Sequence, residues 1–185
     1  MTKAIRIHQA GGPEVLQYED VDIGDVGPDE VRLKHTAIGL NFIDVYQRSG
    51  MYPIGDLPKT LGMEAAGVIE EVGADVEGFA VGDRVAYAMG LGSYAEERVW
   101  GTDRLVKLPD AIDDQTAAAM MLQGMTVYYL LNRTYRVKSG DTILFYAAAG
   151  GVGLIVADHM QVLVPLLEGC GHIRQAHVYL SISVD

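Results

Sequence analysis

Short stretches in which apolar and polar residues alternate recur through the first 108 residues of the chain. Alternation with a period of two is typical of half-buried β-strands, and Gly, Pro and Asp separate the stretches here. We therefore expect an all-β region, built as a compact β-barrel or a sandwich. The expected strands are Ala4–His8, Val15–Glu19, Glu30–Leu40, Ala66–Val72, Arg84–Ala88, Ser93–Trp100 and Leu105–Leu108.

Two stretches break this strand pattern and predict helices. Asn41–Ser49 is short and is expected to end at Gly50, while the stretch from Asp113 to about residue 131 is long and rich in Ala, Met and Leu. Asp113 or Asp114 is expected to cap the longer helix, because a carboxylate is favoured at the positive end of the helix dipole. Gly124, near the middle, leaves open whether this stretch forms one helix or two.

The segment Asp141–Gly153 changes from a run of strand-forming residues to a glycine-rich turn that leads toward helix-forming residues. Residues 148–153 read Ala-Ala-Gly-Gly-Val-Gly, the dinucleotide pattern G-x-G-x-x-G with Ala in the first position. Gly150 would let the backbone approach a pyrophosphate, and Gly153 would let the helix pack closely on the strand. A turn that serves only tight packing is the alternative. The expected cofactor contacts are Ala149, Gly150, Gly151, Val152 and Gly153.

The class of the expected structure changes from all-β to α/β between residues 110 and 125. We place a domain boundary there, with one domain over residues 1–122 and a second over residues 123–185.

Composition excludes several classes of protein. The 185-residue chain has a formal net charge of −11 at pH 7, which disfavours attraction of the whole surface to nucleic acid or to an anionic membrane. No apolar stretch approaches the roughly 20 residues of a membrane span, and the N-terminus has no signal-peptide core, so we expect a cytoplasmic protein. Cys170 is the single cysteine, which excludes an internal disulfide and a thiolate-rich zinc site.

Seven blocks, in order along the chain, resemble the medium-chain dehydrogenase/reductase superfamily and, within it, the zinc-free NADPH:quinone oxidoreductases related to zeta-crystallin. The blocks are Gly11–Leu16, Gly39–Asp44, Leu61–Val68, Val81–Val85, Gly92–Glu96, Gly124–Thr126 and Ala147–Gly153. The resemblance implies a GroES-like β-barrel catalytic domain over residues 1–122 and a Rossmann nucleotide-binding domain after it, with NADPH in the cleft between them. It also implies hydride transfer from NADPH to a small-molecule quinone, and a homodimer.

The resemblance also bears on metals. Zinc-dependent relatives carry a catalytic Cys near the first short helix and a Gly-His-Glu block, whereas this chain has Asn41 and Gly62-Met63-Glu64 in the corresponding places. Tetrahedral zinc needs several N or S ligands, which a lone Glu with a Met does not supply. We therefore expect no metal site and a reaction without metal.

Three catalytic candidates lie around the short helix. Asn41 takes the place of the absent zinc ligand, where its amide could donate to a quinone oxygen or orient the nicotinamide ribose; helix capping is the alternative. Tyr46 and Tyr52 could stack on a flat quinone, or be partly buried structural residues. Asn41 and Asp44 are also candidates for cofactor binding: Asp44 could bind cofactor hydroxyls, or it could be a first-turn acid that the helix dipole favours.

The remaining candidates follow from the resemblance. Thr126 matches the position that contacts the nicotinamide end of the cofactor, although a helical Thr can instead bond to its own turn. Tyr129 is expected beside the cofactor. Glu64 is interpreted as a structural partner of a cation or a backbone amide rather than as a catalytic acid.

The last thirty residues depart from the family pattern, and we expect a non-family tail from about residue 156. A truncated or altered gene is one interpretation, with weak activity because much of the adenosine-binding surface would be missing. The alternative makes residues 153–168 a crossover helix and His177–Val184 a second parallel strand, with Asp185 at the ribose hydroxyls. Two other functions stay open: a non-enzymatic, crystallin-like binding or structural protein, and a reductase of enones or alkenals.

Overall fold

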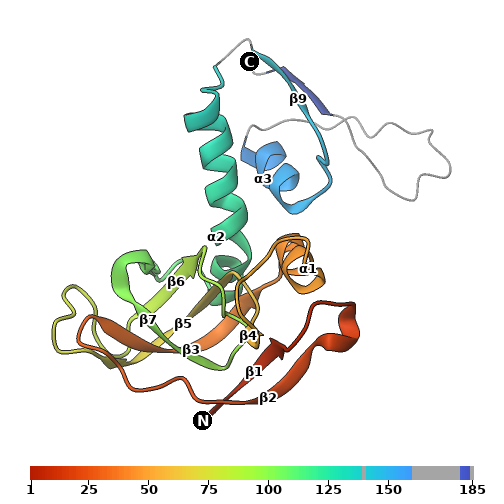
Figure 1. The fold of residues 1–185 in the computed structure, drawn as a ribbon. Helices are drawn as coiled ribbons and strands as arrows, with labels where there is room; N and C mark the ends of the chain where they lie inside the picture. Colours follow the sequence, from red (N-terminus) through yellow and green to blue (C-terminus); the bar gives the residue numbers. More distant parts are fainter. Residues whose placement is uncertain (139–140, 160–179, 184–185) are drawn as a thin grey trace. The chain divides into compact units, whose positions relative to one another are not determined.

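The computed structural model describes residues 1–138, 141–159 and 180–183, and the chain divides into two compact units, residues 1–122 and 123–185. Figure 1 labels most of the elements. The strands are β1 (Thr2–Ile7), β2 (Gln17–Val21), β3 (Glu30–Gly39), β4 (Lys59–Thr60), β5 (Glu64–Val72), β6 (Arg84–Ala88), β7 (Glu97–Gly101), β8 (Val106–Lys107), β9 (Thr142–Phe145) and β10 (Leu180–Ser183). The helices are α1 (Phe42–Ser49), α2 (Asp114–Tyr129) and α3 (Gly151–His159), with 3₁₀ turns at Pro13–Val15 and Thr102–Arg104 and a π turn at Leu130–Thr134.

The first unit contains two antiparallel sheets. One has the strand order β2-β1-β4, and the other has the order β7-β3-β5-β6-β8. The period-two pattern of β3 sets the burial: Val31 and Leu33 are buried, whereas Arg32 and Lys34, which alternate with them, are not. A hydrophobic core forms on the large sheet from Val31, Leu33, Ala65, Ile69, Val85, Tyr87 and Leu105.

The expected closed barrel is not observed. Within the described residues the two sheets are joined by a single isolated bridge, Ala4 to Ala95, and by flanking backbone hydrogen bonds such as Ile5 N–H to the Tyr94 carbonyl (2.7 Å). A barrel requires every edge strand to pair with a neighbour around the ring. Here the large sheet ends at β8, which has only two residues, and the small sheet ends at β2 and β4.

Several element boundaries differ from the sequence-based prediction. Residues 13–15 form a 3₁₀ turn with Pro13 at its start, so β2 begins at Gln17 rather than Val15. Residues 93–96 make cross-sheet hydrogen bonds instead of joining β7. The long helix is continuous through Gly124, because a glycine costs only about 1 kcal/mol in a helix interior.

Both helices of the first unit begin at the caps that the sequence indicates. Asn41 has extended dihedral angles at the N-cap of α1, and Gly50 ends that helix in the left-handed region with φ of 80°. At the start of α2, the Asp113 carboxylate accepts the Thr116 N–H (2.8 Å), while Asp114 accepts two hydrogen bonds from Arg84 (2.6 and 3.0 Å). Asp113 therefore caps α2, and Asp114 ties the first turn of α2 to β6.

The second unit contains the end of α2, β9, α3 and β10. Its core consists of the buried side chains of Val127, Leu131, Ala148 and Val156. β10 pairs with β9 in antiparallel register, with Leu180 opposite Phe145, so the alternative of a second parallel strand is wrong. Antiparallel pairing needs no crossover helix between the two strands. Asp185 and residues 160–168 of the expected crossover lie outside the described residues. Among those that are described, no helix combines the length and the apolar character needed to cross a membrane.

A directional chain of hydrogen bonds lies inside the first unit. A carbonyl can only accept, so His35 must donate from Nδ1 to the Ala95 oxygen (2.6 Å), and its Nε2 then accepts from the Tyr87 hydroxyl (2.9 Å). Arg98 donates in turn to the Tyr87 oxygen (3.1 Å). Burial, aided by the charge of Arg98, lowers the pKa of His35 to about 4.

Acidification is expected to destabilise the first unit through His35. His35 takes up a proton near pH 6.5 in the unfolded chain but only near pH 4 in the folded chain. The contribution of His35 to folding stability is therefore fully present above pH 6.5 and is lost as the pH falls toward 4. The expected loss between pH 7 and pH 5 is about 2 kcal/mol. Urea unfolding followed by Trp100 fluorescence measures it. His35→Gln should remove this part of the pH dependence and His8→Gln should keep it; an unchanged slope in His35→Gln would contradict the assignment.

Candidate functional site

Asn41 stands where β3 ends and α1 begins. Its backbone N–H donates to Oδ2 of Asp44 (2.8 Å), and its side-chain Nδ2 donates to Oε1 of Glu64 (2.6 Å). An Asn or Asp that ends an extended segment and caps a helix is held at a defined position, because its backbone serves both elements. Asn41 is therefore both a helix cap and a partly exposed polar side chain with a fixed neighbour.

Glu64, at the start of β5, is completely buried. Its second oxygen, Oε2, accepts the backbone N–H of Leu122 (2.6 Å). Burial raises the pKa of Glu64, while the hydrogen bonds from Leu122 and Asn41 oppose that rise. The interpretation of Glu64 as a partner of a backbone amide is confirmed by this contact.

Asp44 lies in the first turn of α1 and is only 5% exposed. Its Oδ2 accepts both the Asn41 N–H and the Tyr94 hydroxyl (2.7 Å), and its Oδ1 is buried with no hydrogen-bond partner among the described residues. Burial raises the pKa of Asp44, and burial together with the nearby Asp44 carboxylate also raises the pKa of Tyr94. The structure thus brings Asn41, Asp44, Glu64 and Tyr94 into one polar cluster, which we call the Asn41 cluster.

Three aromatic rings contact one another on α1 and in the turn that follows it. Tyr46 contacts Phe42 edge to face and Tyr52 at a tilt, each with ring centroids 5.1 Å apart. Tyr52 is half exposed, and its backbone N–H bonds to the Tyr46 carbonyl (3.1 Å). The two tyrosines that the sequence singled out therefore lie side by side, with ring surface available to a flat ligand.

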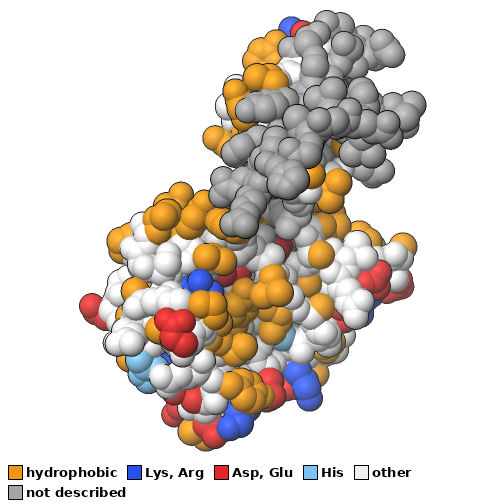
Figure 2. Space-filling model, turned by 90° about the vertical axis from the view of Figure 1, so that its right-hand side faces the viewer, with side chains coloured by type: hydrophobic (Ala, Val, Ile, Leu, Met, Phe, Trp, Pro, Cys, Tyr) orange, Lys and Arg blue, Asp and Glu red, His pale blue; other side chains and the backbone are white. Residues whose placement is uncertain are grey.

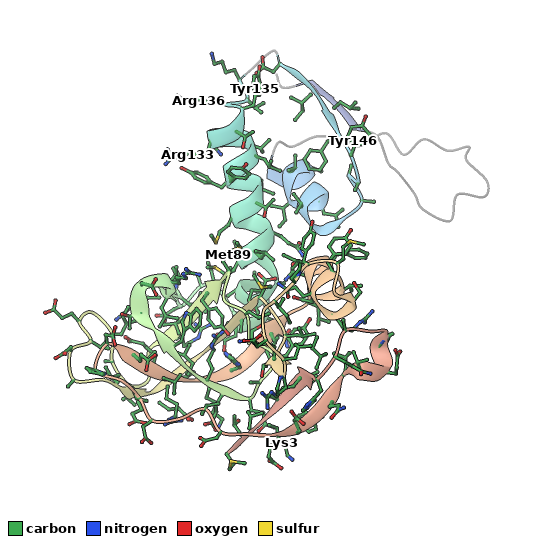
Figure 3. The ribbon with its side chains drawn as sticks, in the orientation of Figure 1. Lys3, Met89, Arg133, Tyr135, Arg136 and Tyr146 are labelled. Carbon is green, nitrogen blue, oxygen red and sulfur yellow. The ribbon has the colours of Figure 1, made fainter. Side chains whose placement is uncertain are left out.

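Two cavities of the first unit adjoin these residues. One, of about 340 Å³, is lined by residues that include Leu40, Asn41, Phe42, Asp44, Arg48 and Tyr94. The other, of about 430 Å³, is lined by Lys3, Tyr18, His35, Ile38, Leu40 and Tyr94 among others. Figure 2 shows hydrophobic side chains gathered on one face of this unit with acidic and basic groups around them, and Figure 3 labels Lys3 on β1. Leu40 borders both cavities and is 77% exposed.

In the second unit, the glycine-rich segment forms the turn between β9 and α3. Ala147 takes a left-handed conformation with φ of 55°, and Gly150 N–H bonds back to its carbonyl (2.8 Å). A Cβ on Gly153 would overlap the backbone of Ala148, whereas one on Gly150 would meet only the Ala147 oxygen, at 3.1 Å. The exposed turn and the first N–H groups of α3 fit a phosphate-bearing cofactor, because such groups have no partner within the helix.

The other cofactor candidates lie on α2. Tyr129 is 55% exposed and Thr126 is partly buried, both in the part of α2 that belongs to the second unit. Tyr146, labelled in Figure 3, is exposed directly before the glycine turn. No three His, Cys, Asp or Glu side chains of the described residues are arranged to hold a metal ion.

Sequence reasoning did not select Tyr94, which completes the Asn41 cluster. The signal was present in the block Gly92–Glu96, where the serine and tyrosine follow a glycine with φ of 114°. Ser93, which follows this glycine, is buried, and the hydroxyl of Tyr94 donates to Asp44, 50 positions away.

Comparison with known proteins agrees with this geometry. Residues 27–110, which contain the strands from β3 to β8, match the family "Alcohol dehydrogenase GroES-like domain". The chain is 54% identical to a quinone oxidoreductase of Pseudomonas aeruginosa over 164 residues, which are 88% of this chain and 50% of that protein. It is 46% identical to a 2-haloacrylate reductase of Burkholderia over 84% of this chain and 49% of that protein.

Among solved structures, that of an Escherichia coli quinone oxidoreductase complexed with NADPH superposes with a TM-score of 0.83 and 46% identity, covering 86% of this chain and 49% of the other. Over the parts that they share, the chain is therefore similar to quinone oxidoreductases that carry a GroES-like domain. It spans about half the length of the curated relatives that it matches.

Proposed function

We propose that this chain acts in the NADPH-dependent reduction of a quinone, without a metal ion. The observation that carries the proposal is its similarity, over 86% of its length, to a structure described as a quinone oxidoreductase complexed with NADPH. Bound NADPH would supply the hydride. The chain's own residues bind and orient the reactants, and the homodimer expected from the family remains a prediction.

Each unit has a separate part in this proposal. The turn Ala149–Gly153 and the first N–H groups of α3 hold the phosphate groups of the cofactor, since glycine lets the backbone come close. Thr126 and Tyr129 bind along the cofactor toward its nicotinamide end. In the first unit, Asn41 contacts the reacting end, and the rings of Tyr46 and Tyr52 stack on the flat quinone.

Asn41→Ala is expected to reduce NADPH-dependent turnover of 1,4-benzoquinone by about tenfold or more, because a fixed polar contact to the reacting end is lost. Asn132→Ala is the matched control: Asn132, in the π turn after α2, is exposed, and among the contacts described its side chain bonds only to the Tyr128 carbonyl of α2. Binding is measured first, by titrating the 185-residue chain with NADPH and following the cofactor's fluorescence. Saturable micromolar binding is expected; no binding, with a full-length relative binding normally, would contradict the proposal.

A second candidate reaction is supported by one comparison, the 46% identity to a 2-haloacrylate reductase. Reduction of a carbon–carbon double bond conjugated to a carboxylate or carbonyl uses the same hydride donor. Assaying 2-chloroacrylate beside 1,4-benzoquinone decides between the two substrates, since the preferred one will have the larger kcat/KM.

A further inference from the structure

The buried carboxylate of Glu64 has both oxygens occupied by N–H donors. Oε1 accepts Nδ2 of Asn41 and Oε2 accepts the backbone N–H of Leu122, each at 2.6 Å. A Cβ on Gly39, the residue that ends β3, would overlap the Glu64 side chain, so the carboxylate is also held sterically. Glu64 thus has a fixed position, with no exposed surface through which it could touch a ligand itself.

A carboxylate only accepts hydrogen bonds, and this decides how Asn41 is oriented. The Asn41 carboxamide has a donor end and an acceptor end of almost the same shape. Facing Glu64, it must present its nitrogen, and its oxygen is therefore turned away from the carboxylate. That oxygen takes part in the capping box of α1 through the Asp44 backbone N–H, and its second lone pair is left for a ligand. We propose that Glu64 is a positioning residue that sets which end of the Asn41 amide meets the ligand, and that this end is the oxygen.

This orientation specifies the ligand group at Asn41. A carbonyl oxygen accepts from a hydroxyl or an amide N–H and is repelled by another bare carbonyl oxygen. The matching partner is thus a hydroxyl or carboxamide of the cofactor rather than an unprotonated quinone oxygen. The inference rests on the proposed function for the identity of that ligand, while the orientation of Asn41 rests on the contacts alone.

Glu64→Gln replaces one carboxylate oxygen, an acceptor, with an NH₂ donor and keeps the side chain nearly the same shape. The Leu122 N–H needs an acceptor, so the oxygen of the introduced glutamine stays there and its NH₂ group turns toward Asn41. Two donors would then face each other, and the Asn41 amide is expected to flip so that its oxygen accepts from this NH₂ group. A ligand donor would now meet the Asn41 nitrogen, and NADPH binding is expected to weaken about tenfold or more.

The double variant Asn41→Asp with Glu64→Gln should restore binding. One oxygen of the new carboxylate at position 41 accepts from the NH₂ group at position 64, and the other again offers an acceptor to the ligand. We expect affinity for NADPH within about threefold of the unaltered chain. Asn41→Asp alone places two carboxylates together and should bind poorly at neutral pH and better as one of them takes up a proton.

The orientation can also be observed without a ligand. The chain has two asparagines, Asn41 and Asn132, so ¹⁵N-Asn labelling gives two side-chain amide signals, with Asn132 as internal control. In Glu64→Gln the Asn41 signal should move while that of Asn132 stays. A strong cross-relaxation signal between the introduced glutamine's NH₂ protons and the Leu122 N–H would show that no flip occurred and would overturn the proposal.

The NADPH affinities of the variants test whether the Asn41 oxygen is the end that meets the ligand. Unchanged NADPH affinity in Glu64→Gln, or a double variant no better than Glu64→Gln, overturns the assignment of the oxygen to the ligand. Trp100 fluorescence verifies that each variant is folded. If the unaltered chain binds no NADPH, the proposed function fails, and the amide signals alone then support or overturn the positioning role.

Discussion

Replacement of Arg98 by alanine is expected to lower the free energy of unfolding of residues 1–122 by about 3–5 kcal/mol. Arg98 is 8% exposed, and its guanidinium stacks 3.7 Å from the Trp100 ring centroid. It donates to the Tyr87 oxygen and to the carbonyls of Gly90 and Leu91, at 3.1 to 3.2 Å. Alanine removes the stacked plane, opens a cavity and leaves buried acceptors without donors. Urea unfolding followed by the fluorescence of Trp100, the single tryptophan, measures the change.

Two variants separate the causes of that loss. Arg98→Lys keeps the charge but loses the planar group that stacks on Trp100 and the forked donors. Its free energy of unfolding should therefore remain well below that of the unaltered chain. Arg104→Ala is the control, since the Arg104 side chain is 52% exposed and one hydrogen bond to the Met89 carbonyl (2.9 Å) contributes about 1 kcal/mol at most. A loss below about 1 kcal/mol in Arg98→Ala would mean that the guanidinium does not support this core.

Alanine at Gly153 is expected to abolish measurable NADPH binding and to destabilise the second unit. The added Cβ would overlap the oxygen, carbon and Cα of Ala148, all of them backbone atoms that cannot turn aside as a flexible side chain can. α3 must then move away from the turn, at a cost of about 1–3 kcal/mol, and its N-terminal N–H groups lose their position. Hydrogen exchange of the α3 amides reports the stability, and the fluorescence titration reports the binding.

Gly150→Ala is the matched comparison. Its Cβ would meet only the Ala147 oxygen, at 3.1 Å, so the second unit should keep nearly normal exchange rates. Binding should still weaken, because the methyl group occupies the surface that a pyrophosphate would approach. Normal binding in Gly153→Ala would show that the turn serves packing alone, which is the alternative that its sequence pattern leaves open.

The elements whose signals lie within a few residues could be predicted from the sequence. Val31 and Leu33 alternate with charged residues, and that alternation places β3 and its buried face correctly. Asn41 and Gly50 mark the ends of α1, and Asp113 caps α2. The start of β2 was predicted less accurately, because the strand pattern of residues 15–19 competed with the turn preference of Pro13. The fixed φ of Pro13 favours a 3₁₀ turn before the strand begins.

The candidate site could be predicted only in part. Asn41 follows from its place at a helix start and from the family resemblance, and the glycine turn follows from its own pattern. Tyr94 was missed, because the block Gly92–Glu96 indicates a turn but not the distant residue, Asp44, that the Tyr94 hydroxyl reaches. The closed barrel was wrong for a related reason: alternation identifies a strand and its buried face but not the strand beside which it lies.

The sequence by itself determined the periodicities, the caps and the glycine turn, since each depends on neighbours close along the chain. Only the tertiary structure decided that Glu64 accepts from Leu122, 58 positions away, and from Asn41, and that Arg98, Tyr87 and His35 form one directed chain. These contacts depend on strand register and on which buried donors must find acceptors, and both are set by packing the whole sheet at once.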